Sequence, residues 1–139
     1  MLKKDQELKN TGKNSEDIFE SWVQKQDGYL YRFEDFYDAK KKGKVANRKP
    51  SDYLVTLSGS TFMAEVKSTT KNTFSFSNIQ PEQWRNAIKI TRADGEYYFF
   101  IHLLALNEWF RVPARRIIDS AKKSINIKEL SEYKLELVL

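Results

Sequence analysis

Asp52, Glu65 and Lys67 are the side chains whose types and spacing could carry out chemistry. Twelve residues separate Asp52 from Glu65, and a single residue separates Glu65 from Lys67. Two carboxylates supply the oxygen ligands that Mg²⁺ and Mn²⁺ prefer, and a metal held there would stabilise the charge that develops on a phosphate. The Lys67 ammonium could add to that stabilisation. The spacing predicts metal-dependent hydrolysis of a phosphodiester, and it leaves open a plain cross-strand ion pair between Asp52 and Lys67.

The composition limits which cofactors such a site could use. The chain has 139 residues, 40% of them hydrophobic, which suits one folded domain and excludes a disordered protein. There is no cysteine and one histidine, His102, so thiolate and histidine-rich metal sites are excluded. We therefore expect Mg²⁺, with Mn²⁺ as a substitute, and no small-molecule organic cofactor. His102 lies in an apolar segment and is expected to be a core residue.

No part of the sequence predicts a membrane segment. No apolar run approaches the roughly 20 residues that a membrane span requires. The charged N-terminus does not lead into an apolar signal segment. We expect a soluble, cytoplasmic protein that does not bind membranes.

A hairpin is needed to bring the two carboxylates together. Residues 52–57 and 62–67 alternate as strands, so Glu65 and Lys67 share one face. A two-residue turn at Gly59-Ser60 would place Asp52 opposite Lys67 and diagonal to Glu65, roughly 7–8 Å away. A slip of one residue would move Asp52 to the other face.

The preceding helix adds a third carboxylate. We expect this helix to begin at Asn14 or Ser15 and to end near Gln26, with an apolar stripe that faces the sheet. Glu16 falls at the edge of that stripe, whereas Glu20 is expected to point further toward solvent. This favours Glu16 as the third carboxylate of the metal site.

The remaining patterns predict a single α/β domain, a mixed β-sheet with flanking helices. Residues 1–13 are expected to be a flexible N-terminus, and 14–139 the folded domain. The other expected elements are strands at 29–36, 96–105, 108–112 and 134–138, and helices at 81–92 and 113–123.

Basic side chains that could bind phosphate are concentrated in one segment, 38–50. It carries six basic residues against Asp38 alone, although a solvated loop would have the same composition. Two further cations, on the loop and helix that follow the hairpin, are plausible phosphate contacts. The candidate nucleic-acid contacts are Lys40, Lys41, Lys42, Lys44, Arg48, Lys49, Lys71 and Arg85.

These features together resemble the PD-(D/E)XK nuclease superfamily and, more closely, the RecU-type Holliday junction resolvases of Gram-positive bacteria and their phages. In the superfamily motif the proline directly precedes the aspartate, whereas here one extra residue, Ser51, lies between Pro50 and Asp52. The resemblance covers residues 12–112. The matching pieces are Gly12-x-x-x-Glu16, Ser51-Asp52-Tyr53, Ala64–Thr69, Phe74–Phe76 and Gln83.

The resemblance implies a restriction-endonuclease-like core and a magnesium-dependent endonuclease that cuts branched double-stranded DNA at four-way junctions as a homodimer. Asp52, Glu65 and Glu16 would bind metal, Lys67 would stabilise the transition state, and Gln83 would position water. The basic loop at 38–50 would take the place of the stalk that enters the junction. Two rival hypotheses remain: a restriction or repair endonuclease on the same scaffold, and a DNA-binding module without turnover.

Overall fold

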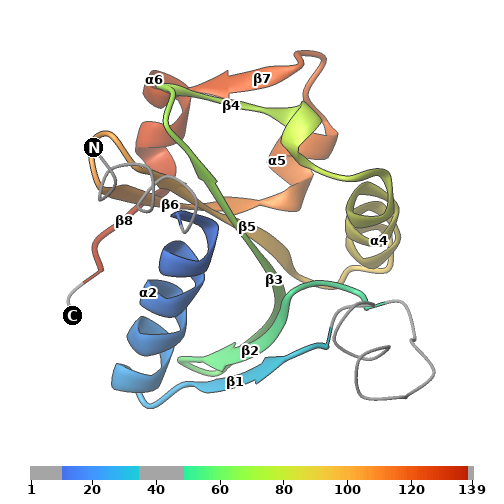
Figure 1. Ribbon diagram of the computed structural model, residues 1–139. Coiled ribbons are helices and arrows are strands. Elements are labelled where there is room, and N and C mark those ends of the chain that lie inside the picture. Colours follow the sequence, from blue (N-terminus) through green and yellow to red (C-terminus); the bar gives the residue numbers. More distant parts are fainter. Residues whose placement is uncertain (1–10, 35–48, 138–139) are drawn as a thin grey trace.

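The computed structural model describes residues 11–34 and 49–137, which form one mixed sheet with helices on both faces (Figure 1). The strand order of the six-stranded sheet is β1-β2-β3-β5-β6-β8, and β4 and β7 form a separate two-stranded sheet. The elements are α2 (Thr11–Lys25), β1 (Tyr29–Arg32), β2 (Tyr53–Leu57), β3 (Ser60–Thr69), β4 (Thr73–Ser75), η1 (Phe76–Asn78), α4 (Pro81–Arg92), β5 (Tyr97–Leu103), β6 (Glu108–Pro113), α5 (Ala114–Ile118), β7 (Ser124–Asn126), α6 (Ile127–Leu130), η2 (Ser131–Tyr133) and β8 (Lys134–Leu135).

The sheet is mixed, as the sequence predicts. β3 and β5 run parallel, and every other pairing in the six-stranded sheet is antiparallel. The parallel pair requires a crossover, and α4 lies within it, between β3 and β5. Across the parts of the chain that are described, no helix has the length and apolar character needed to cross a membrane.

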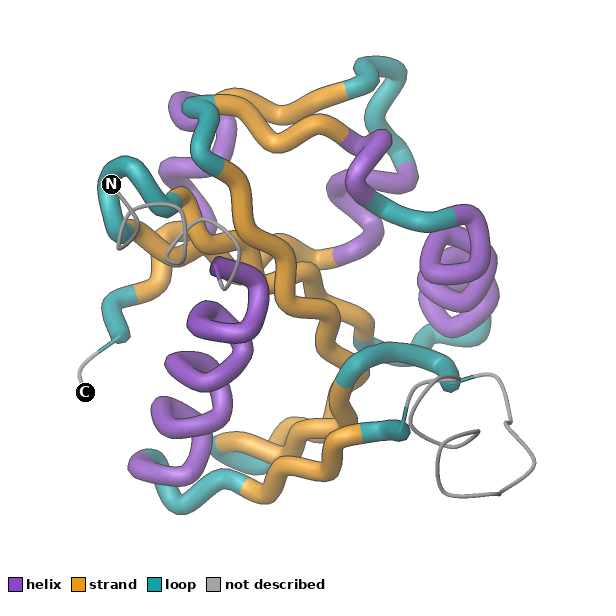
Figure 2. Tube along the Cα trace, in the orientation of Figure 1, coloured by secondary structure: helices purple, strands orange, loops and turns teal. Residues whose placement is uncertain are grey.

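Two apolar cores lie on opposite faces of the sheet. On one face, α2 packs Phe19 against Phe100 and Tyr53, with ring centroids 4.6 and 5.3 Å apart. On the other face, Phe99 belongs to a core to which α4 and α5 contribute. Because successive strand residues point to opposite faces, the adjacent pair Phe99 and Phe100 serves both cores. Figure 2 shows α2 and α4 on either side of the central strands.

The hairpin turn differs from the expected one by one position. Its central residues are Ser58 and Gly59, with φ angles of 51° and 86°, and Leu57 pairs with Ser60. Positive φ at both positions matches a type I′ turn, whose twist suits a two-residue hairpin and which places Gly second. The register therefore shifts by two residues from the prediction. An even shift leaves the predicted faces of both strands unchanged.

The first helix begins earlier than predicted. α2 starts at Thr11, so neither Asn14 nor Ser15 is its cap. Ser15 is fully buried inside the helix, and its Oγ lies 2.8 Å from Nδ1 of His102 on β5. The small hydroxyl lets the helix approach the sheet closely while satisfying a buried imidazole nitrogen. His102 is a core histidine, as predicted, stacked on Trp109 with ring centroids 4.4 Å apart.

Two predicted segments differ from the structure. The helix expected at 113–123 ends at Ile118, with Asp119 as its C-cap. The chain then forms β7, in which Ile125 pairs with Phe74 of β4, a strand that the polar sequence around it concealed. Both side chains are buried, so tertiary packing outweighs the local pattern. Of the strand predicted at 29–36, Tyr29–Arg32 is observed, and 35–36 fall outside the described residues.

Candidate active site

Asp52 and Glu65 lie side by side at the start of the hairpin. The β2–β3 pairing of Tyr53 with Ala64, continued by one residue, puts Asp52 directly opposite Glu65 rather than Lys67. The carboxyl groups are close enough to share a hydrogen bond. Two main-chain bonds fix Asp52: the Val66 N–H donates to its Oδ2 at 3.3 Å, and the Phe33 N–H donates to its carbonyl at 3.0 Å. The alternative that the sequence left open, a plain cross-strand ion pair of Asp52 with Lys67, is therefore not the arrangement observed.

Glu65 is almost completely buried, with 1% of its surface exposed, and it is held by two donors. Gln83 of α4 donates from Nε2 to Oε2 at 3.1 Å, and the Tyr97 hydroxyl of β5 donates to Oε1 at 3.0 Å. The main chain also holds Gln83, because its Oε1 accepts from the N–H of Gln80 at 3.0 Å, closing a capping box at the start of α4. The helix start therefore fixes the amide that contacts Glu65.

The pair of carboxyls has opposite pKa shifts. Burial, and then the negative charge of Asp52, raise the pKa of Glu65 to about 9. Burial also raises the pKa of Asp52, but hydrogen bonding from Glu65 and the nearby Lys49 ammonium outweigh burial and leave it lowered. Two carboxyls this close disfavour ionising together, so at neutral pH the pair shares one proton.

A divalent cation fits this donor set. Two carboxyls in contact cannot both ionise easily unless a positive charge lies between them. A divalent cation would supply that charge and replace the shared proton. Within residues 11–34 and 49–137, no group of three or more His, Asp or Glu side chains is arranged to hold a metal. Asp52 and Glu65, of the three carboxylates predicted for a metal site, are the two that lie directly opposite each other.

Lys49 lies against the site instead of projecting toward solvent. Its Nζ donates to Oδ1 of Asp52 at 3.0 Å, in an ion pair that is only partly exposed. Asn86 of α4 donates to the Lys49 carbonyl at 3.1 Å, and the Tyr97 hydroxyl lies 3.4 Å from the carbonyl of Pro50. Hydrogen bonds therefore hold this segment to α4 and β5, and it positions Asp52 just before the start of β2.

Glu16 lies on the α2 side of the sheet, in an ion pair with Arg32 of β1 at 3.1 Å. Burial raises its pKa, and the charge of Asp52 contributes in the same direction, so the two carboxylates sense each other. The prediction that Glu20 points further toward solvent than Glu16 is wrong. Both side chains are 26% exposed, and Glu20 accepts a hydrogen bond from the Tyr53 hydroxyl at 2.9 Å.

Of the other predicted site residues, Lys67 and Arg85 lie on the α4 side of the sheet, opposite the side of α2. Lys67 shares a face of β3 with Glu65 and lowers the pKa of that carboxyl by its charge. Arg85 lines a hollow of about 300 Å³ next to Pro50, and Lys71 lines another of about 390 Å³ beyond the end of β3. The remaining predicted contacts lie outside the described residues: Lys40, Lys41, Lys42, Lys44 and Arg48.

Tyr97 is the site residue that the sequence did not reveal. It sits in the run Tyr97-Tyr98-Phe99-Phe100, which predicts sheet core, and its ring is indeed buried. The signal that could have found it is the hydroxyl, since a buried tyrosine needs a hydrogen-bond partner and a phenylalanine does not. Trp84, close to Gln83 on α4, packs against Phe76 at 6.0 Å between ring centroids and is partly buried against the core.

Comparison with known proteins gives consistent matches in sequence and structure. Residues 18–139 match the family model described as RecU, Recombination protein U. "Holliday junction resolvase RecU" of Ureaplasma parvum serovar 3 is 27% identical over 100 residues, which cover 69% of this chain and 59% of that protein. The protein of the same name from Mycoplasmopsis pulmonis is 28% identical over 103 residues, covering 73% and 65%. The chain thus spans less than two thirds of the length of these two relatives.

A solved structure shares the fold. The structure of Archaeoglobus fulgidus Hjc, described as a Holliday junction resolvase from an archaeal hyperthermophile, aligns with a TM-score of 0.63 at 15% identity. The alignment covers 90% of this chain and 95% of that one. This likeness confirms the predicted fold class, a mixed sheet with flanking helices.

Proposed function

The chain belongs to the RecU (Recombination protein U) family, and from that premise we propose that it is an endonuclease that hydrolyses DNA phosphodiesters at four-way junctions. The observation that carries the proposal is the buried Glu65 paired with Asp52 and held by Gln83. The names of the two relatives support a Holliday junction as the substrate. The intact carboxylate pair favours an active enzyme over a binding module.

Each site residue has a role that follows from its position. Asp52 and Glu65 hold Mg²⁺, for which Mn²⁺ can substitute, and Glu16 assists from the α2 side. The bound metal supplies Lewis acidity toward the phosphate and toward water. Lys67, two residues beyond Glu65 on the same face, places its ammonium where negative charge develops on the phosphate. Gln83 fixes the orientation of Glu65 and can also orient water through its amide.

The substrate and assembly follow from the same proposal. Branched double-stranded DNA is the partner, and the basic side chains of 38–50, with Arg85, contact its phosphates. A four-way junction offers two equivalent strands to cut, whereas each chain carries a single copy of the Asp52–Glu65 pair. A homodimer would supply both sites.

Removal of each carboxylate charge tests whether the site cuts DNA. With Mg²⁺ present, Asp52→Asn and Glu65→Gln should each lower the cleavage rate of a labelled junction on the order of 10²–10³-fold, with binding retained. Asp119→Asn, an exposed carboxylate at the end of α5, is the matched control and should cut normally. Cleavage by wild type that persists in EDTA would contradict the metal role. Undiminished cleavage by either site variant would contradict the assignment of the pair.

A further inference from the structure

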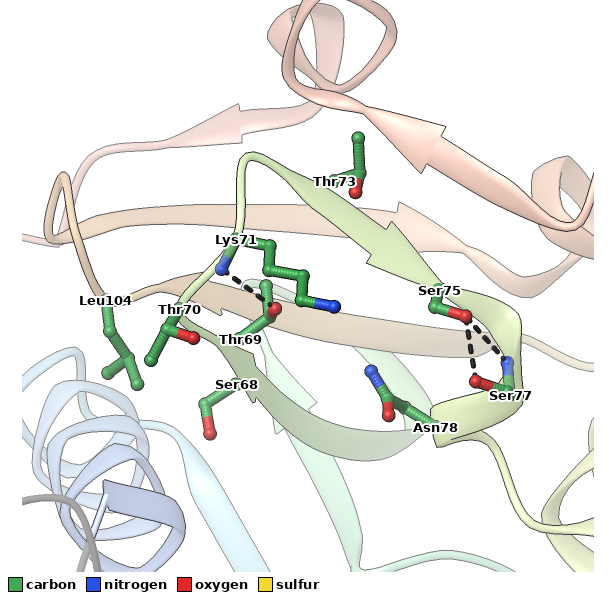
Figure 3. Close-up of a pocket in the computed structure, with 9 residues that line it drawn as sticks. All are labelled: Ser68, Thr69, Thr70, Lys71, Thr73, Ser75, Ser77, Asn78 and Leu104. Atoms are coloured by element: carbon green, nitrogen blue, oxygen red, sulfur yellow. Dashed lines mark hydrogen bonds between the residues drawn. The ribbon is translucent and has the colours of Figure 1, made fainter.

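A polar groove continues the site beyond the end of β3. It has a volume of about 390 Å³ and lies between the last residues of β3, β4 and η1 (Figure 3). Its lining comprises six hydroxyl side chains, the amide of Asn78, the ammonium of Lys71 and one apolar side chain, Leu104. There is no carboxylate among these residues, so the groove offers hydrogen-bond donors and one positive charge.

Lys71 is the charged group of this groove. Its side chain reaches across the groove in the direction of Asn78 (Figure 3). In the described parts of the chain no carboxylate forms an ion pair with Lys71, whereas Lys49, Lys122 and Lys134 are each paired. An unpaired ammonium beside neutral donors suits an anion with several acceptor oxygens, which a phosphate provides.

The local structure holds these donors in place. The Lys71 N–H donates to Oγ1 of Thr69 at 3.2 Å, which fixes the turn that carries the lysine. Across the groove, the hydroxyls of Ser75 and Ser77 lie 2.8 Å apart, and the Ser77 N–H donates to the Ser75 hydroxyl. The groove is therefore formed by ordered backbone on both sides.

The groove and the carboxylate pair lie along one strand face. Glu65, Lys67 and Thr69 alternate on β3, so they share a face, and Thr69 lies about 13 Å beyond Glu65 along an extended strand. On the opposite side, η1 leads into α4, whose Gln83 contacts Glu65. A nucleic-acid strand cut at Glu65 would pass Lys67 and reach the groove roughly two nucleotides later, because successive phosphates of one B-DNA strand lie about twice as far apart as the axial rise of 3.4 Å.

We propose that this groove is a second phosphate site, which binds the sugar-phosphate backbone of the cut strand about two nucleotides from the scissile phosphate. Lys71 contacts the phosphate, and the hydroxyls and Asn78 contact its oxygens and the sugar. The inference rests on the proposed nuclease function, and it adds where the cut strand runs and in which direction along β3.

Single neutral phosphates in the substrate test the second phosphate site. Binding is measured in EDTA with a series of junctions, each of which carries one methylphosphonate, at positions from one to five nucleotides to either side of the cut. The affinity of wild type should fall roughly three- to tenfold when the methylphosphonate is near two nucleotides from the cut, on one side only. Lys71→Ala should bind unmodified DNA more weakly by a similar factor, show a salt slope lower by about 1, and be insensitive at that same position.

The matched control is Lys25→Ala, which removes the same charge at the far end of α2 (Figure 1). Lys25→Ala and Lys71→Arg should both lose affinity at the same methylphosphonate position as wild type. If Lys71→Ala stays as sensitive as wild type at every position, the second phosphate site is wrong while the nuclease function stands. If wild type binds no junction DNA, the function and the second site both fail.

Discussion

Glu65 is the residue whose surroundings most directly determine the chemistry of the site. Burial and Asp52 disfavour its charged form, while Lys67 and the Tyr97 hydroxyl favour it. The carboxylate needed for a metal is therefore maintained by a few specific contacts, and their loss should appear first as weaker metal binding.

Tyr97→Phe tests this dependence without disturbing the ring packing. Loss of the hydroxyl removes a donor that stabilises the ionised carboxylate, so Mg²⁺ affinity measured by calorimetry should fall about 10- to 100-fold. Tyr98→Phe is the matched control, because the Tyr98 hydroxyl donates to Glu96 instead. Equal Mg²⁺ affinities for the two variants would show that Tyr97 does not support Glu65.

His102 provides a second residue-scale prediction, concerning pH. Burial lowers its pKa below the ordinary value, and the hydrogen bond to Asn107 only partly opposes this. The unfolded chain therefore takes up a proton more readily than the folded protein. The stability that neutral His102 contributes is fully present above about pH 6.5, its unfolded pKa, and is lost as the pH falls.

The measurement for His102 is the difference in unfolding free energy between wild type and His102→Gln, from urea titrations between pH 5 and 8. Taking the difference cancels the other titrating groups, Glu65 included. The unfolding free energy of wild type should exceed that of the variant by a constant amount above about pH 7, and this difference should shrink toward pH 5. An advantage that does not change with pH would mean that His102 is not held neutral.

At the scale of elements, the turn between β2 and β3 sets which side chain faces Asp52. Gly59 has a φ of 86°, and a Cβ added there would meet no atom within 4 Å. Replacement by alanine thus costs backbone strain alone, without a steric clash. Gly59→Ala should lower the unfolding free energy by about 1 kcal/mol in urea titrations. Gly59→Asn should cost less, because asparagine tolerates positive φ, and equal costs would contradict this account of the turn.

The sequence predicts the elements better than their exact pairing. Alternation is enough to put Glu65 and Lys67 on one face of β3, because a strand has a period of two. The register depends on which two residues take positive φ, and Ser58-Gly59 and Gly59-Ser60 are both acceptable turn sequences. The sequence was therefore enough to predict that Asp52 and Glu65 are diagonal neighbours on adjacent strands. It was not enough to predict that they lie directly opposite each other.

Contacts between elements distant in the sequence were the least predictable. The positions of Tyr97 and Lys49 at the site arise from the parallel β3–β5 pairing and from the contact of Asn86 with the segment before β2. The β4–β7 pairing likewise depends on the burial of Phe74 with Ile125. Local patterns carry no information about these partners, because tertiary packing determines them.

At the scale of the whole molecule, one sheet joins both cores to the site. α2 covers one face, and α4 and α5 the other (Figure 2). Asp52 and Glu65 lie where the hairpin contacts α4 through Gln83. The net charge of +5 adds a general attraction for nucleic acid. With the proposed second phosphate site, this defines a path for one DNA strand along β3.

The proposed homodimer is a prediction at the same scale. Sedimentation equilibrium should give about twice the mass of the 16.4 kDa chain at micromolar concentration. A mixed dimer of wild type with Asp52→Asn chains should nick one strand of a junction and leave the other intact. A monomer that makes both cuts in one binding event would contradict the two-site arrangement.

The most direct test of the central claim compares cleavage of a four-way junction with cleavage of linear duplex and single strand of the same sequence. The measurement is the rate under single-turnover conditions, with Mg²⁺ and with EDTA. Paired nicks on the junction, much slower cutting of the linear DNAs and no cutting in EDTA are the predicted result. Equal cutting of linear duplex would contradict the junction substrate, and no cutting of any DNA would contradict the nuclease itself.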